Sequence, residues 1–250
     1  MGSEAAPAKL GTLEILRRYP FKGMRGEDVA EAFVTFSGLI GDRAYAFVDP
    51  TRPADFPWMT GRLAREMILF QPRFLTPPDP KQERPSLKHF LAEVVTPEGE
   101  KLCVDDPGFT SYFAKRFDRT LELRFSERAM HDTCPISLLG LDSIEKLSEE
   151  AGFALDHRRF RANFYVRWEN RNPFYEHEFV GAKLRIGEKL VVMVVKNDQR
   201  CVIINLDPAT AEANPKVLEV VARNHASCFG VYGSVLREGI VRVGDPVYAA

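Results

Sequence analysis

The stretch 189–210, KLVVMVVKNDQRCVIINLDPAT, places a short polar segment between two apolar runs. Both runs are short and rich in valine and isoleucine, a composition typical of buried β-strands. We therefore interpret 189–196 and 200–206 as strand-like, with Cys201 at the start of the second run. Four interpretations of this cysteine are open at this point: a core side chain, a disulfide partner, a nucleophile or a metal ligand.

The segments around this stretch mix strand-like and helix-like patterns. Towards the C-terminus, 215–225 predicts a helix and 239–249 a strand with a GD turn, while 160–168 and 177–196 are strand-like. The clearest helix lies within 134–153, where apolar side chains recur at every third position, LDS supplies a start and Gly152 a stop. Those apolar positions are Leu138, Leu141, Ile144 and Leu147.

Strand patterns dominate the first third of the chain. The run that opens 12–23 and two alternating runs in 31–50 predict strands, the latter two joined by a GLIGDR turn in which Gly38 and Gly41 supply backbone freedom. Further expected elements are a strand or short helix in 63–74, a loop over 76–85, two strands in 88–106, a helix in 109–119 and a strand in 120–126. The fold class is therefore α+β and strand-rich with a barrel-like sheet, and its character changes near residue 125.

Composition and charge argue against several classes of protein. The 34 basic and 35 acidic residues give a net charge of −1, so nucleic-acid binding is not expected. No apolar run approaches the roughly 20 residues that span a bilayer, and MGSEAAPAKLG lacks the apolar core of a signal peptide. We expect a cytoplasmic protein without membrane attachment, and a disordered lead over residues 1–10.

The four cysteines show none of the spacings of a cysteine framework. Cys103, Cys134, Cys201 and Cys228 form no Cys-x-x-Cys pair, which argues against a zinc ribbon, a plant-type iron–sulfur cluster and a disulfide scaffold. A functional cysteine is therefore expected to act singly. Arg200 beside Cys201 favours the thiolate, the form that binds soft metals or attacks electrophiles.

Basic residues recur beside turns. Arginine forks and backbone N–H groups near glycine suit phosphate and other oxyanions, although each such residue has solvated surface charge as its alternative. No GxxxxGK[ST] or GxGxxG pattern occurs, so common nucleotide-binding loops are not indicated. The turn-associated residues are Lys22, Arg43, Arg62, Arg161 and Arg200.

Four segments together resemble the MOSC family, named for the C-terminal domain of molybdenum cofactor sulfurases, and in particular its amidoxime-reducing branch. YPFKG (19–23) resembles the opening of the family's N-terminal β-barrel domain, and GLIGDRAYAFVD with WMTGR its arginine-bearing hairpin and following strand. HDTCPISLLGLDSIEKL with FRANFYV resembles the start of the MOSC domain, and RCVIINLDPAT with FGVYGSVLREGIVRVGDPV its metal-binding end. The resemblance implies an N-terminal β-barrel-like domain over 11–125 and a MOSC domain over 126–250.

The resemblance implies that Cys201 gives a thiolate to molybdenum, which the pterin dithiolene and oxo groups otherwise hold. The cofactor would be the molybdenum cofactor in its molybdopterin form. Three positions depart from the family pattern: Cys134 and Gly23 replace serine, and FRAN replaces FRPN. The residues matching cofactor-binding positions are Lys22, Gly23, Arg43, Thr133, Cys134, Arg161, Asn163, Gln199, Arg200 and Tyr232.

The activity that the resemblance implies is reduction of small N-hydroxylated substrates, such as amidoximes or hydroxylamino-purines. We expect no membrane anchor, ferredoxin domain or sulfurase domain, so electrons would come from a separate ferredoxin-like, flavin or haem carrier protein. The alternatives are a sulfur-transfer or cofactor-carrier protein that uses Cys201, and a non-enzymatic binding module. Pyridoxal phosphate binding is a further family-level possibility.

Overall fold

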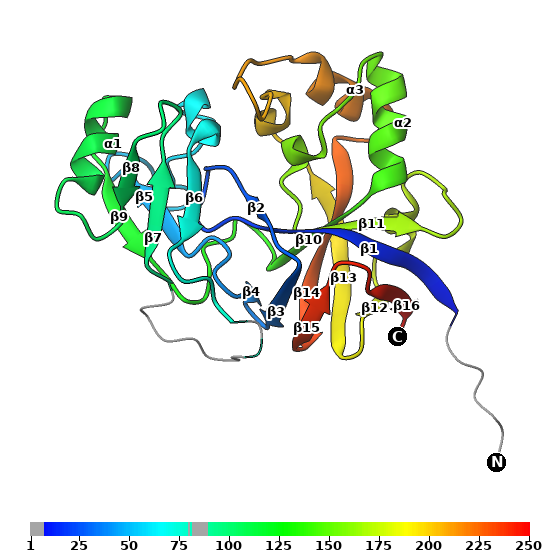
Figure 1. Ribbon diagram of the computed structural model, residues 1–250. Coiled ribbons are helices and arrows are strands. Elements are labelled where there is room, and N and C mark those ends of the chain that lie inside the picture. Colours follow the sequence, from blue (N-terminus) through cyan, green and yellow to red (C-terminus); the bar gives the residue numbers. More distant parts are fainter. Residues whose placement is uncertain (1–7, 80, 82–89) are drawn as a thin grey trace.

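The computed structural model describes residues 8–79, 81 and 90–250, and it is an α+β, strand-rich protein with two halves side by side (Figure 1). This confirms the predicted fold class. Of the predicted loop over 76–85, residues 80 and 82–85 lie outside the described residues, as do residues 1–7 of the predicted lead.

A closed barrel of seven strands forms the larger half, and closure leaves its sheet without an open edge. The strand order is β11-β10-β14-β13-β12-β16-β1, and β1 pairs again with β11. Leu13, Leu16, Phe164 and Trp168 are fully buried in the barrel core. The strands are β1 (Lys9–Arg18), β10 (Ile136–Gly140), β11 (Phe164–Trp168), β12 (Lys183–Ile186), β13 (Leu190–Gln199), β14 (Cys228–Arg237) and β16 (Pro246–Ala249).

One barrel strand, β1, comes from the start of the chain, whereas the other six lie beyond residue 125. Lys9 and Leu10, which are predicted to belong to the disordered lead, are part of β1 instead. Leu10 packs against the barrel core, and its carbonyl accepts a hydrogen bond of 2.9 Å from the Glu169 N–H. The domain boundary between residues 125 and 126 stays a prediction. β1 precedes that boundary in the sequence, but it is a strand of the barrel that residues after the boundary form.

Short sheets around an aromatic core form the other half. The sheets are β15-β3-β4, β5-β9 and β6-β7-β8. Phe21, Phe47, Phe70, Phe109 and Phe113 are fully buried together in this core. The elements are β3 (Glu31–Thr35), β4 (Gly38–Leu39), β5 (Tyr45–Val48), η1 (Arg65–Leu69), β6 (Gln71–Phe74), β7 (Ala92–Val95), β8 (Lys101–Cys103), α1 (Phe109–Phe117), β9 (Glu122–Phe125) and β15 (Gly239–Arg242). The β15-β3-β4 sheet contributes to both cores, because Val34 and Val241 are buried in the barrel core and Phe33 in the aromatic core. The short strand β2 (Glu27–Asp28) pairs with the end of β1.

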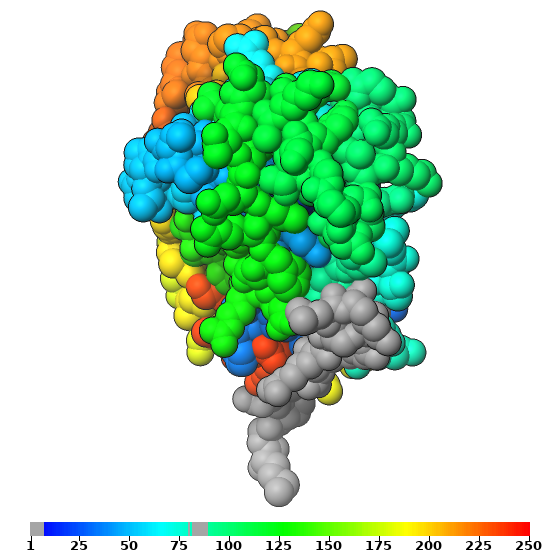
Figure 2. Space-filling model, turned by 90° about the vertical axis from the view of Figure 1, so that its left-hand side faces the viewer, coloured from blue at the N-terminus to red at the C-terminus, as the bar shows by residue number. Residues whose placement is uncertain are grey.

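The two strands predicted around the GLIGDR turn exist as β3 and β5, but they pair with other strands. β3 pairs with β15 from the far end of the chain, and β5 pairs with β9. The segment 63–74 contains both of its predicted alternatives, since η1 is followed by β6. In Figure 2, which faces this half, the green segments that include α1 and β9 cover the centre of the face.

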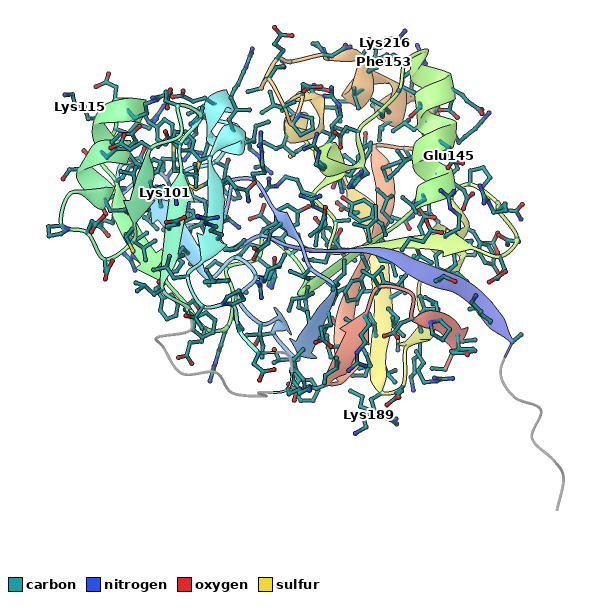
Figure 3. All side chains as sticks on the ribbon, in the orientation of Figure 1. Lys101, Lys115, Glu145, Phe153, Lys189 and Lys216 are labelled. Atoms are coloured by element: carbon teal, nitrogen blue, oxygen red, sulfur yellow. The ribbon has the colours of Figure 1, made fainter. Side chains whose placement is uncertain are left out.

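Two helices, α2 (Leu141–Ala151) and α3 (Lys216–Asn224), pack on the outside of the barrel. Leu138 and Leu139 are consecutive in β10, and they enter the barrel core and the helix-facing core respectively. The helix therefore begins at Leu141, and the expectation that Leu138 belongs to it is wrong, because Leu138 pairs with Phe164 of β11. The charged ends of Glu145 on α2 and Lys216 on α3 point outward (Figure 3).

The second apolar run of the opening stretch is not a strand. β13 continues through the polar NDQ to Gln199, and Val202–Asn205 then forms the 3₁₀ helix η5. Ile204 is buried against α3, and its neighbour Ile203 packs against that cluster and also against Ile68 and Leu206. The tight turn therefore places Ile203 in contact with both halves of the molecule. Two further 3₁₀ helices are η3 (His157–Phe160) and η4 (Tyr175–Phe179).

Candidate functional site

A cavity of about 540 Å³ is lined by residues from both halves of the molecule. We call it the site cavity. Lys22, Arg43 and Arg62 reach it from loops of the first half, while η3, β13 and β14 approach it from the second half. All the predicted site residues line it: Lys22, Gly23, Arg43, Thr133, Cys134, Arg161, Asn163, Gln199, Arg200, Cys201 and Tyr232. Their individual roles stay predictions.

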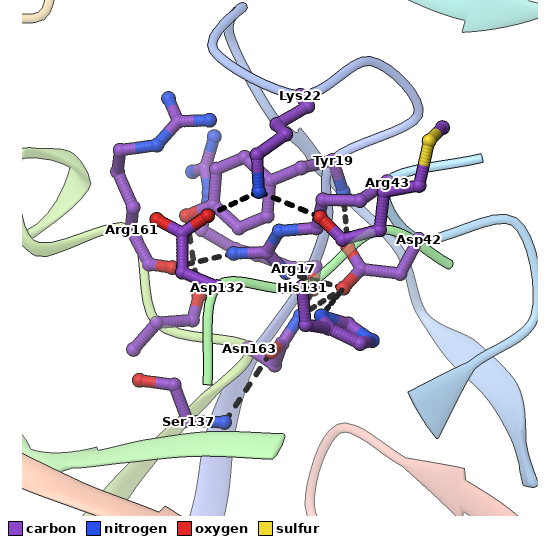
Figure 4. Close-up of polar contacts among 12 residues, drawn as sticks. Arg17, Tyr19, Lys22, Asp42, Arg43, His131, Asp132, Ser137, Arg161 and Asn163 are labelled. Carbon is purple, nitrogen blue, oxygen red and sulfur yellow. Dashed lines mark hydrogen bonds and ion pairs between the residues drawn. The ribbon is translucent and has the colours of Figure 1, made fainter. Parts of the chain in front are cut away.

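Lys22 enters the cavity because the backbone before it is tied to β5. The Lys22 N–H donates to the Tyr45 carbonyl at 2.7 Å, and the Tyr45 N–H donates to Pro20 at 3.0 Å. The Lys22 ammonium donates to the Met130 carbonyl at 2.6 Å and pairs with the Asp132 carboxylate (Figure 4). Burial lowers the pKa of Lys22, and Asp132 opposes that effect.

Arg43 and Arg161 meet on one aromatic ring although they lie far apart in the sequence. Their guanidinium carbons lie 4.4 and 4.6 Å from the centroid of the buried Tyr19 ring. The Arg43 guanidinium also donates to the Arg161 carbonyl at 3.2 Å. Burial lowers the pKa of Arg43, but its ion pair with Asp42 outweighs this and the net shift is upward. Burial lowers the pKa of Arg161 to about 10.

Asn163 joins three segments beneath these cations. Its side-chain N–H groups donate to the Asp42 carboxylate and to the Arg17 carbonyl, both at 3.2 Å, and its Oδ1 accepts from the Ser137 N–H at 3.4 Å. Asp42 accepts in addition from the Tyr19 N–H at 2.7 Å. Asn163 and Asp42 are each 1% exposed, so this network holds the floor of the cation cluster in place.

Cys201 lies where β13 passes into η5, and its thiol is half-buried. The preceding residue is fixed on both sides: the Arg200 N–H donates to the Ser227 carbonyl at 2.8 Å, and the Arg200 guanidinium pairs with buried Asp198. Burial raises the pKa of Asp198, although Arg200 acts in the opposite direction. The thiol is therefore held at the cavity wall by a rigid neighbour.

The site cavity carries an excess of positive charge. Six cationic and two acidic side chains line it, namely Lys22, Arg43, Arg62, Arg161, Lys196 and Arg200 against Asp132 and Asp198. Within the described part of the chain, Arg62, Arg161 and Lys196 form no ion pair with a carboxylate. An anion with several acceptor oxygens suits such a surface.

Sequence reasoning missed several lining residues. Among them are His131 and Asp132, whose partners are distant in the sequence: His131 Nε2 lies 3.0 Å from the Ser37 carbonyl, and Asp132 pairs with Lys22. Burial lowers the pKa of His131. Phe56, Thr60, Lys196 and Cys228 also line the cavity, and nothing in their local sequence distinguishes them.

The fold agrees with comparisons to known proteins. Residues 126–248 match the family model of the MOSC domain, and the chain is a MOSC-domain protein. A curated relative is mitochondrial amidoxime reducing component 2 of Rattus norvegicus, which is 24% identical over 292 residues, covering 96% of this chain and 83% of the relative. The crystal structure of the YUAD protein from Bacillus subtilis has the same fold, with a TM-score of 0.52, 13% identity, and coverage of 96% of this chain and 94% of that one.

The part of the chain that the structure describes was searched for membrane-spanning helices and for clusters of metal-binding side chains. No helix in it is long and apolar enough to cross a membrane. It also contains no group of three or more histidine, cysteine or acidic side chains that could hold a metal ion.

Proposed function

We propose that this chain is a molybdenum-cofactor oxidoreductase that reduces N-hydroxylated substrates, such as amidoximes or hydroxylamino-purines, to the amine. One observation carries the proposal: a single cavity brings together the half-buried Cys201 thiol and the cations Lys22, Arg43 and Arg161. The name of the relative from Rattus norvegicus, an amidoxime reducing component, supports the choice of substrate class.

The residues in the cavity fit the cofactor. Lys22, Arg43 and Arg161 would hold its phosphate, assisted by the Gly23 N–H, because charge-assisted donors from both halves converge there. Arg161 has no carboxylate partner within the described residues, and the buried Nε of Arg200 has no acceptor, so both retain donor capacity. The remaining predicted cofactor contacts are Thr133, Cys134, Asn163, Gln199, Arg200 and Tyr232.

The cofactor, when bound, supplies two-electron redox chemistry and accepts the substrate oxygen. Cys201 would provide a soft thiolate ligand from the protein. Conversion of N–OH to N–H consumes two electrons and two protons and releases water. The protein contributes the charge of the cavity, the fixed position of the thiol beside Arg200, and the shape that admits a small substrate.

Electrons would come from a separate carrier protein. The chain has no GxGxxG pattern for a dinucleotide and no clustered cysteines for an iron–sulfur centre. The four cysteines lie in the described residues and all are free. A transient interface with a ferredoxin-like, flavin or haem carrier would meet this need.

The test is expression in a host that makes the cofactor, followed by molybdenum and pterin analysis and an amidoxime reduction assay with an artificial electron donor. We expect bound molybdenum near one per chain and measurable amine formation. Bound cofactor without reduction would favour the alternative of a sulfur-transfer or carrier protein that uses Cys201. Absence of both would favour a non-enzymatic binding module.

A further inference from the structure

A second cavity lies next to the site cavity, and five arginines line it. They come from β1, the loop after it and the η3 segment, while Ile203, Leu206 and Pro208 close another side. None of the described residues that line it is acidic. The two cavities share Arg161 and Ile203. We call the second one the arginine cavity; its arginines are Arg17, Arg25, Arg158, Arg159 and Arg161.

Carboxylates from outside this lining neutralise three of the five guanidinium groups. Asp28 pairs with Arg17 at 2.7 Å, Asp207 pairs with Arg159 at 2.6 Å, and Asp156 pairs with Arg158. Across residues 8–79, 81 and 90–250, neither Arg25 nor Arg161 forms an ion pair. Two positive charges at the arginine cavity are therefore without a carboxylate partner.

Buried donors at this cavity also lack acceptors. The Nε atoms of Arg17, Arg25 and Arg159 are buried and have no hydrogen-bond partner. Arg17 is 4% and Arg159 7% exposed, so water reaches these side chains poorly. A buried charged donor without an acceptor is costly. Burial lowers the pKa of Arg25, and repulsion from Arg158 and Arg17 adds to this, which agrees with an excess of positive charge.

We propose that the arginine cavity binds one small inorganic anion. Arginine forks match the acceptor geometry of oxyanions such as phosphate. The enclosed volume of about 20 Å³ is little more than the ~10–15 Å³ that one water molecule needs, so a phosphate would enter only with outward movement of the half-buried Arg25 and Arg158 side chains, and a nucleoside has no room. An anion there would supply the missing acceptors and lie beside Arg161, whose side chain also lines the site cavity. The inference does not depend on the function proposed above.

The test uses cofactor-free protein and radiolabelled inorganic phosphate in equilibrium dialysis at low chloride. In the wild-type protein we expect binding that Arg25→Ala weakens by at least about tenfold, because a charge-assisted donor is removed. Lys22→Ala should leave this binding in place, since Lys22 lines only the site cavity and its ammonium contacts Met130 and Asp132, which lie outside the arginine cavity. Phosphate bound only in the site cavity would bind more weakly to the site-cavity variant and equally well to Arg25→Ala. If the wild-type protein binds one phosphate in each cavity, each variant should bind only one phosphate per chain.

Matched controls keep the result interpretable. Arg223→Ala removes an exposed arginine of α3 and should change nothing. Arg158→Gln offers a second test if Arg25→Ala does not fold, and Arg25→Lys should restore part of the binding. Phosphate binding unchanged in folded Arg25→Ala and Arg158→Gln proteins would overturn the proposal. Competition by a mononucleotide as strong as that by phosphate would overturn the assignment to a free ion.

Discussion

At the scale of single residues, Cys201 differs from the other cysteines in its surroundings. Cys103 lies in β8, where its thiol donates to the Ala92 carbonyl at 3.5 Å, and it does not line the site cavity. Cys134 and Cys228 do line the cavity, but only Cys201 follows an arginine that is fixed by backbone and ion-pair contacts. This difference permits a clean comparison between two cysteine substitutions.

We expect Cys201→Ser to lower reductase activity by at least about a hundredfold, because a hard hydroxyl that is hardly ionised replaces a soft thiolate. The molybdenum absorption spectrum should change, while the unfolding midpoint stays near that of the wild type because the thiol is only half-buried. Cys103→Ser is the matched control and should remain active. Full activity in Cys201→Ser would contradict the assigned role.

Lys22 gives a prediction about pH. Its pKa is lowered by burial, so its positive charge is fully present below the lowered value and disappears as pH rises through it. Phosphate binding to the site cavity should therefore fall at a lower pH than the ordinary lysine value of ~10.4 would give. Equilibrium dialysis across alkaline pH measures this, and Lys22→Arg should retain binding to higher pH. An unchanged pH profile in Lys22→Arg would show that another group controls binding.

At the scale of elements, the site depends on how the WMTGR loop meets η5. A Cβ added to Gly61 would lie 2.6 Å from Ile203 Cδ1 and 3.1 Å from Ile68 Cγ2. The loop backbone therefore touches the turn that follows Cys201, and the same loop carries Arg62 into the site cavity. Glycine at this position allows the two halves to approach closely at the point where the cavity forms.

Gly61→Val should force these two elements apart. We expect a loss of about 1–3 kcal/mol in the free energy of unfolding, the usual range for an overpacked contact. Urea denaturation measures the loss, and cofactor retention should fall with it. Gly108→Ala is the control, because a Cβ at Gly108 meets nothing within 4 Å. Equal stability of the two variants would mean that the loop moves away from η5 without cost.

At the scale of the whole molecule, the site cavity exists because two halves with separate cores face each other. Loops of the first half and the segments η3, β13 and β14 of the second half contribute different walls. The chain passes from one half to the other after β1, which belongs to the barrel, while Phe21 and Met24 enter the aromatic core. The pairing of β15 with β3 gives a second link between distant parts of the chain. The relative position of Cys201 and the cation cluster is therefore a property of the complete fold.

The proposed function requires an external electron source. Purified holoprotein with substrate and NADH alone should show negligible reduction, because no dinucleotide-binding pattern occurs in the chain. A flavin reductase with a ferredoxin-like or haem carrier should restore turnover, and reduced viologen should bypass the partner. Amine formation is the measurement. Steady turnover with NADH and no added protein would contradict this prediction.

Local patterns in the sequence determined most element types. The strand-rich class, α1, α3 and the hairpin β7–β8 follow from periodicity and turn residues, which act over a few neighbouring positions. Gly152, with a φ of 78°, ends α2 as expected, because glycine enters the left-handed region at little cost. The motif resemblance selected lining residues of the site cavity without any knowledge of distances.

Only the tertiary structure decided the rest, because the deciding contacts join residues that are distant in the sequence. Leu138 carries a helical spacing but lies in a strand between β11 and β14. The RCVIINL run turns into η5, where Ile204 is buried against α3 and Ile203 also packs against Ile68 from a distant part of the chain. The pairing of Asp132 with Lys22 has no local signal. The arginine cavity also has no local signal in the sequence, because its arginines come from separate segments that meet beside Tyr19 only in the folded chain. Burial and charge excess depend on every neighbour in space, and a linear pattern records only the neighbours along the chain.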